Sequence, residues 1–134
     1  MHTFNWPVRV YYEDTDAGGV VFYANYLKFF ERARTEMLRS MGFEQDRLID
    51  EQGIIFVVRS VQIDYLMPAR FNEQINVSAI VTLAKKASLI FEQTITRGSD
   101  VLCTGTVRIA CLDSKNMRPK AIPDILLEPL HNEC

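Results

Sequence analysis

In the second half of the chain, apolar and polar residues alternate with a period of two, the spacing of a β-strand that buries one face. The first such run covers residues 54–66 and ends just before Pro68, which has no backbone N–H to donate to a sheet. Short polar turns separate the later runs, with Lys85-Lys86 in one turn and Gly98 in the next. These later runs cover residues 74–83, 89–95 and 101–112. The pattern therefore predicts consecutive strands.

The first half carries the longer period of an amphipathic helix, which we expect at residues 23–41. Its apolar residues fall on one stripe, formed by Tyr26, Phe30, Ala33, Met37 and Met41 and widened by Leu27 and Leu38. Gly42 follows directly and favours the end of a helix. A short strand is predicted before the helix, at residues 6–12, and a second short helix after it, at residues 44–51, closed by Gly53.

The predicted order is a strand, a long helix and then strands joined by short turns. Short connections favour antiparallel pairing in a meander, and the long helix is available to cover the apolar face of the sheet. The sequence therefore predicts an α+β fold, with one antiparallel sheet wrapped around one long helix, in a single domain over residues 1–134. Residues 6–12 or 54–66 are the candidates for an unpaired edge, which soluble proteins usually cover.

The composition excludes several classes of function. The net charge is −2 and the 15 basic residues are spread along the chain, whereas a nucleic-acid surface needs clustered positive charge. No apolar run reaches the roughly 20 residues that cross a bilayer, and the N-terminus does not resemble a signal peptide. Cys103, Cys111 and Cys134 lack paired spacing, and only His2 and His131 could add imidazole ligands. We expect a cytoplasmic protein without metal or cofactor, in which Cys103 and Cys111 are packed, reduced thiols.

The residues of chemical interest gather at the turn ahead of the long helix. Asp14 and Asp16 precede Gly18 and Gly19, and the helix begins shortly afterwards. A helix N-terminus offers unpaired backbone N–H groups and the positive end of the helix dipole, which stabilise negative charge on a carbonyl oxygen. A carboxylate beside it supplies a base or a nucleophile. The segment therefore indicates an acyl-transfer site.

The same turn has two alternative interpretations, a purely structural turn and a calcium-binding loop. Asp14 and Asp16 are also typical turn residues that accept hydrogen bonds from their own backbone, and Asp14 fits that structural role better. The spacing of Asp14, Asp16 and Gly19 matches the first, third and sixth places of an EF-hand loop. Gly18 and Asn25, however, stand at the fifth and twelfth places, where that loop needs an oxygen side chain and a bidentate Glu. Calcium binding is therefore not predicted.

Residues 15–22, Thr-Asp-Ala-Gly-Gly-Val-Val-Phe, resemble the signature of the 4-hydroxybenzoyl-CoA thioesterase family of hotdog-fold proteins. The helix segment 30–36 and the tail 117–123 are similar to one branch of it, the Tol-Pal-associated acyl-CoA thioesterases of Gram-negative bacteria. The resemblance extends from Trp6 to Pro123. It implies a hotdog fold and an enzyme that hydrolyses an acyl-CoA thioester to the free acid and CoA.

The resemblance also implies roles at the turn. Asp16 corresponds to the family residue that activates water or attacks the carbonyl itself. The backbone N–H groups of Val21, Phe22 and Tyr23 correspond to the helix start that holds the carbonyl oxygen. Tyr23 stands where the Tol-Pal branch has a His and the aryl-CoA branch a Tyr, so its hydroxyl is a further candidate donor. Tyr12 maps near the site, where it is either a site residue or an ordinary strand aromatic.

Gly18 and Gly19 serve a turn, and their missing side chains also let a thioester approach the backbone ahead of the helix. Glu31 is an alternative candidate for the catalytic residue, because another hotdog branch uses a Glu carried on the helix. Its spacing from Lys28 and Arg34 instead predicts a solvated ion pair.

CoA carries phosphates, so its site needs positive charge. Lys85 and Lys86, with Ser88 just beyond them, match the basic stretch from which the family holds the nucleotide end, and Arg59 is a further candidate. The same residues would also suit an ordinary solvated hairpin turn.

The alternative, from a different class of function, is a non-catalytic hotdog scaffold that binds acyl groups or acyl carrier protein in lipid metabolism. The carboxylate of Asp16 argues against it, because a binder does not need one in the acyl path. The resemblance further implies a site built between subunits, in a homodimer joined back to back into a homotetramer. We expect Lys85 or Arg59 of one subunit to lie near Asp16 of the other.

Overall fold

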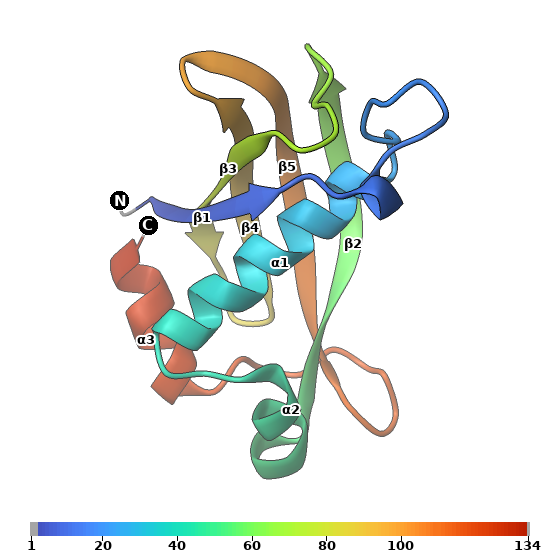
Figure 1. The fold of residues 1–134 in the computed structure, drawn as a ribbon. Helices are drawn as coiled ribbons and strands as arrows, with labels where there is room; N and C mark the ends of the chain where they lie inside the picture. The colour runs from blue at the N-terminus through green and yellow to red at the C-terminus, as the bar shows by residue number, and fades with distance from the viewer. Residues whose placement is uncertain (1–2, 134) are drawn as a thin grey trace.

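The computed structural model describes residues 3–133 and shows an antiparallel five-stranded sheet curved around one long helix (Figure 1). The strands are Phe4–Arg9 (β1), Ile54–Tyr65 (β2), Gln74–Ala84 (β3), Ser88–Arg97 (β4) and Asp100–Asp113 (β5). The helices are Asn25–Ser40 (α1), Gln45–Arg47 (α2) and Asp124–Glu133 (α3), with a 3-10 helix at Tyr12–Asp14 (η1) and a π-helical turn at Leu48–Gln52 (η2). The predicted α+β architecture is confirmed.

The strand order across the sheet is β1-β3-β4-β5-β2. Strands β3, β4 and β5 form the predicted meander, but the prediction was wrong for β2, which pairs with β5 from Ile54↔Asp113 to Tyr65↔Cys103. The reason is that residues 66–73 form a longer connection that contacts the start of α1, instead of a hairpin turn between β2 and β3. Ala69 is buried there and accepts the Val21 N–H at 2.8 Å. Both strands predicted as edge candidates, β1 and β2, are edges of the sheet.

The first strand lies earlier than its predicted range of 6–12. Its pairing with β3 ends at Arg9↔Gln74. The chain then leaves the sheet and closes η1, in which the Asp14 N–H donates to the Tyr11 carbonyl at 3.0 Å. The aromatic residues that continue the strand pattern in the sequence therefore belong to this turn, because turn hydrogen bonds replace ladder bonds there.

Helix α1 packs across the concave face of the sheet (Figure 1). Most of the predicted stripe is buried, Leu38 included, and Phe29 joins it. Leu27 is 39% exposed, so the prediction was wrong for that residue. At Phe30 the helix comes so close to β5 that a Cβ at position 105 would lie 2.6 Å from its Cε2 atom, closer than atoms can pack. Gly105 is therefore the residue that lets the helix approach in mid-strand.

The C-terminal helix α3 was not predicted. It buries Leu126 and Leu130, together with Ile122 just before it, and packs beside β3. Pro129 inside the helix interrupts the usual sequence pattern of a helix. Tertiary packing therefore decides this element.

Cys103 and Cys111 are buried, free thiols on β5, as predicted. Burial raises the pKa of Cys103 to about 12 and that of Cys111 to about 11, so both stay protonated at neutral pH. His2 and Cys134 lie outside the described residues. Within residues 3–133 no helix is long and apolar enough to cross a membrane, and no cluster of metal-binding side chains is found.

Candidate functional site

Asp14 and Asp16 lie two residues apart but have different surroundings. Asp14 is only 5% exposed. Its carboxylate accepts the Tyr11 N–H at 2.9 Å and the side-chain amide of Asn25 at 2.8 Å. These bonds tie η1 to the first turn of α1 and give Asp14 the structural role that the sequence favoured. Asn25 is a part of this site that sequence analysis missed, because nothing local links the two positions.

Asp16, in contrast, is exposed at the tip of the turn. One carboxylate oxygen, Oδ1, accepts the Gly18 N–H at 2.8 Å, and no partner of the other oxygen is found among residues 3–133. The Asp16 N–H donates to the Val20 carbonyl at 2.9 Å, and Gly19 closes the loop with φ +77°, where a glycine is favoured. The turn therefore holds the carboxylate through Oδ1 and leaves Oδ2 available to accept a proton or to attack a carbonyl carbon.

The three predicted oxyanion donors are not equivalent. The Val21 N–H donates to the Ala69 carbonyl at 2.8 Å, and the Phe22 N–H donates to the Asp14 carbonyl at 3.0 Å. The Tyr23 N–H has no acceptor within the described part of the chain. A carbonyl oxygen could therefore be accepted at Tyr23 without breaking a hydrogen bond of the fold.

Aromatic side chains surround this helix start. The Tyr65 hydroxyl donates to the Tyr23 carbonyl at 3.0 Å, which fixes the start of α1 at the Tyr65 end of β2. A pocket of about 260 Å³ lies here, lined by Val21, Tyr23, Tyr26, Tyr65, Leu66, Met67 and Pro68. Burial raises the pKa of Tyr26, whose hydroxyl accepts the Ala69 N–H. Tyr12 does not line this pocket, and its ring stacks on that of Phe71 with the centroids 3.8 Å apart.

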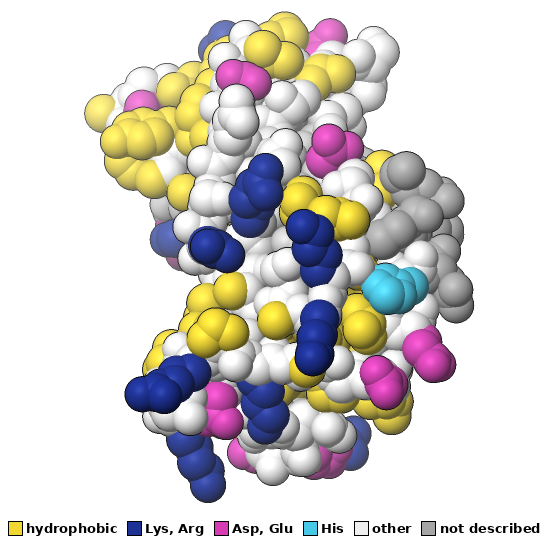
Figure 2. Space-filling model, turned by 180° about the vertical axis from the view of Figure 1, so that it is seen from behind, with side chains coloured by type: hydrophobic (Ala, Val, Ile, Leu, Met, Phe, Trp, Pro, Cys, Tyr) yellow, Lys and Arg dark blue, Asp and Glu magenta, His cyan; other side chains and the backbone are white. Residues whose placement is uncertain are grey.

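Positive charge gathers on the opposite, outer face of the sheet, where Figure 2 shows Lys and Arg side chains in loose groups. A depression of about 370 Å³ there is lined by Arg59, Leu83, Lys85, Ser88, Leu89, Ile90, Arg108 and Ile109. We call it the basic depression. Three predicted CoA residues, Arg59, Lys85 and Ser88, meet in it, while Lys86 does not line it. Arg108 was missed, although its position between the inward-facing Val107 and Ile109 already marked it as outward-facing.

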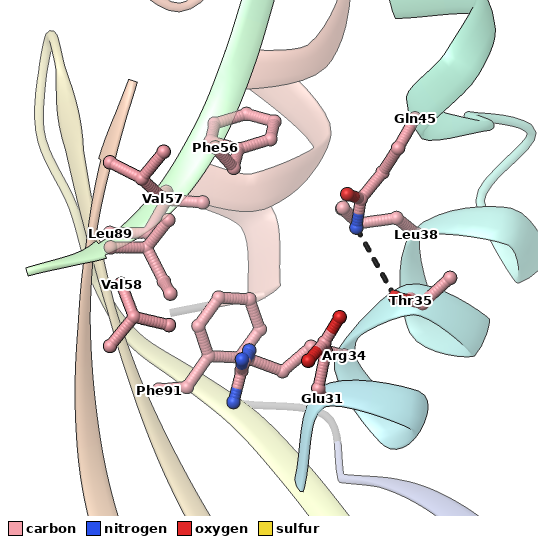
Figure 3. Close-up of a pocket in the computed structure, with 11 residues that line it drawn as sticks. Glu31, Arg34, Thr35, Leu38, Gln45, Phe56, Val57, Val58, Leu89 and Phe91 are labelled. Atoms are coloured by element: carbon pink, nitrogen blue, oxygen red, sulfur yellow. Dashed lines mark hydrogen bonds between the residues drawn. The ribbon is translucent and has the colours of Figure 1, made fainter. Parts of the chain in front are cut away.

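A third cavity, of about 290 Å³, lies between α1 and β2 and is shown in Figure 3. We call it the inner pocket. The predicted surface ion pair of Glu31 with Lys28 or Arg34 is absent among the described residues. The prediction failed because Arg34 turns inward and donates to the Gln93 side chain at 2.9 Å. Glu31 stays exposed at the rim of the pocket.

The chain as a single copy therefore does not assemble all predicted site residues. Asp16 and the Tyr23 N–H lie at the Tyr65 end of β2, where Val20 bridges Arg70. The basic depression lies nearer the middle of β2, at Arg59.

Comparison with known proteins identifies the family of the chain. The sequence profile of the thioesterase-like superfamily matches residues 10–130. The chain belongs to this superfamily. The acyl-CoA thioesterase YbgC of Haemophilus influenzae is 46% identical over 129 residues, which cover 96% of this chain and 95% of that protein.

Solved structures of other proteins share the fold. A probable thioesterase from Bartonella henselae is 34% identical and superposes with a TM-score of 0.87, covering 91% of this chain and all of that one. The 1,4-dihydroxy-2-naphthoyl-CoA thioesterase of Synechocystis, at 20% identity, has a TM-score of 0.89 and covers 98% of this chain and 97% of its own. The hotdog fold and the family resemblance seen in the sequence are confirmed.

Proposed function

We propose that this protein hydrolyses acyl-CoA thioesters to the free acid and CoA. The observation that carries the proposal is the exposed Asp16 carboxylate, with one unbound oxygen, on the turn that leads to the unoccupied N–H of Tyr23. Membership of the thioesterase-like superfamily and the names of the similar proteins support it.

In the proposed reaction the thioester carbonyl oxygen accepts a hydrogen bond from the Tyr23 N–H, at the positive end of α1. Asp16 either removes a proton from the attacking water or attacks the carbonyl carbon itself. The C–S bond then breaks, and CoA leaves as a thiol after taking up a proton. When water attacks, the free acid forms directly. When Asp16 attacks, water must then cleave the mixed anhydride between the acyl group and Asp16, which releases the acid and restores the carboxylate. Because the Val21 and Phe22 N–H groups already have acceptors, the oxyanion role falls to Tyr23.

We further propose that two copies pair through β2. The other edge strand is poorly suited, because Pro7 lacks an N–H and Arg9 brings charge to the edge. Strand β2 has no proline, and Val58, Val61 and Tyr65 leave apolar surface exposed along it. Soluble proteins rarely leave such an edge open.

Antiparallel pairing of two β2 strands would also complete the site. The Tyr65 end of one strand would lie beside the Phe56 end of the other, since the two run in opposite directions. Asp16 and Tyr23 of one copy would then approach the inner pocket and the basic depression of the second copy. A homodimer with two equivalent sites follows, and it can join further into a homotetramer.

A panel of acyl-CoA substrates, followed by the release of free thiol, tests the activity. The panel should run from acetyl-CoA to palmitoyl-CoA and include 4-hydroxybenzoyl-CoA. We expect turnover of at least one member. The alternative, a scaffold that binds acyl groups or acyl carrier protein, would bind such ligands without releasing thiol. A cytoplasmic location, an association with Tol-Pal and partners in lipid synthesis rest on the resemblance and stay predictions.

The basic depression makes a separate prediction. Its three cations, Arg59, Lys85 and Arg108, have no ion-pair partner among the described residues, so their charge is available for CoA phosphates. We expect Lys85→Gln combined with Arg108→Gln to raise KM for acyl-CoA by about tenfold with little change in kcat, because the contact lies far from the reacting bond. The measurement is steady-state kinetics.

The control for this experiment is Lys115→Gln, which removes an exposed cation from the loop after β5. It should leave KM unchanged. If the double variant also keeps its KM, the nucleotide end of CoA binds elsewhere.

A further inference from the structure

Arg34 is an unusual residue for the middle of a helix that covers a sheet. It is only 8% exposed, yet it forms no ion pair with any carboxylate of residues 3–133. Its guanidinium has five N–H donors, and among residues 3–133 the only hydrogen bond found for it is the one to Gln93. A buried cation without a paired charge is costly, so a partner is expected for the remaining donors.

Gln93 holds the guanidinium in a fixed place. Its side-chain N–H group donates to the carbonyl of Phe30 at 3.0 Å and to that of Ser78 at 3.3 Å. Its carbonyl oxygen is therefore turned to Arg34 and accepts from it. Gln93 is itself 1% exposed, so this polar bridge between α1 and β4 lies inside the protein. Gln93 therefore holds the Arg34 guanidinium in one position, and the remaining N–H donors of that group are oriented before any ligand binds.

The inner pocket lies next to this fork. Figure 3 shows Arg34 extending from α1 toward the sheet, among the side chains that line the cavity. Most of the lining is apolar, formed by Leu38, Phe56, Val57, Val58, Leu89, Phe91 and Ile109. Burial lowers the pKa of Arg34 to about 10, and the charge of Glu31 opposes that shift, so the guanidinium remains a cation at neutral pH. The cavity therefore combines an apolar body with one buried positive charge, and the exposed carboxylate of Glu31 lies at its rim.

We propose that the inner pocket takes the acyl group of the thioester, and that Arg34 binds a carboxylate at its far end. This inference rests on the proposed function and names its substrate class, CoA thioesters of dicarboxylic acids. The apolar walls fit a methylene chain, and a volume of about 290 Å³ suits a short or medium chain. The fork of a guanidinium matches a carboxylate, with which it can form two parallel hydrogen bonds.

The test compares thioesters that differ only at the far end of the chain. Adipyl-CoA is measured against hexanoyl-CoA, and suberyl-CoA against octanoyl-CoA, with the wild-type protein. We expect kcat/KM to be at least about tenfold higher for the dicarboxylic member of one pair. If both monocarboxylic members are hydrolysed as well or better, the inference is overturned while the proposed function stands. If no thioester of the wider panel is hydrolysed, the proposed function itself fails.

Arg34→Gln and Arg34→Lys test the residue. Both should abolish the preference for the dicarboxylic thioester, measured as the ratio of kcat/KM within each pair, and the control Arg32→Gln, on the exposed side of α1, should keep the preference. A preference that survives in both Arg34 variants would show that another group binds the carboxylate. If the variants fold poorly, the wild-type comparison still decides.

The same carboxylate could come from the product acid instead of the substrate. Calorimetric titration of the wild type and Arg34→Gln with hexanoate separates the two sources. We expect at most weak hexanoate binding. Tight binding that requires Arg34, without a preference among the thioesters, would make the pocket a product site and overturn the substrate assignment.

Discussion

Replacing Asp16 by Asn or Ala is expected to lower kcat/KM for thioester hydrolysis by at least about 100-fold. The physical reason is that the reaction loses the exposed carboxylate that stands beside Gly18 ahead of the helix, and Asp14 cannot replace it because it is buried and both its oxygens accept hydrogen bonds. The measurement is thiol release from the best substrate of the panel, together with thermal unfolding.

The two variants separate chemistry from turn structure. An Asn at position 16 retains an oxygen that can accept the Gly18 N–H, so it should preserve the turn and still remove the base or nucleophile. Glu13→Gln is the matched control, since Glu13 is an exposed carboxylate of the same segment, and it should keep full activity. Near-wild-type activity of Asp16→Ala would reduce Asp16 to a turn residue and direct the search to Glu31.

Placing two carboxylates on the exposed face of β2 is expected to convert a dimer into a monomer and to abolish activity. Val58 and Val61 are 49% and 37% exposed although they belong to a strand of the sheet. In the proposed dimer they lie at the centre of the paired edges, where Val58→Asp with Val61→Asp would oppose like charges across the two-fold axis. Sedimentation equilibrium at micromolar concentration and thiol release measure the two effects.

Ile125→Asp is the control for this experiment. Ile125 is 63% exposed but lies on α3, away from β2, so its variant should remain dimeric and active. The proposed assembly would be refuted by a wild-type protein that sediments as a monomer with full thioesterase activity. The shared site would be refuted by a monomeric double variant that remains fully active.

The sequence by itself determined the long helix α1 and the strands of the sheet, but not the C-terminal helix α3. The stripe on α1 and the alternation along β3, β4 and β5 depend on local spacing, because a helix or a strand must turn its apolar side toward a core. The motif at residues 15–22 also identified the family, and the inward parity of Cys103 and Cys111 indicated buried thiols.

Only the tertiary structure decided which polar groups are free. It placed β2 beside β5, brought Asn25 to Asp14, turned Arg34 inward to Gln93 and gave the Val21 and Phe22 N–H groups their acceptors. Each of these contacts joins residues that are distant in the chain or depends on a crossover, so no local pattern reports it. Burial and hydrogen-bond partners are properties of the assembled core, and they are the basis on which we propose that the Tyr23 N–H, Asp16 and Arg34 meet the substrate.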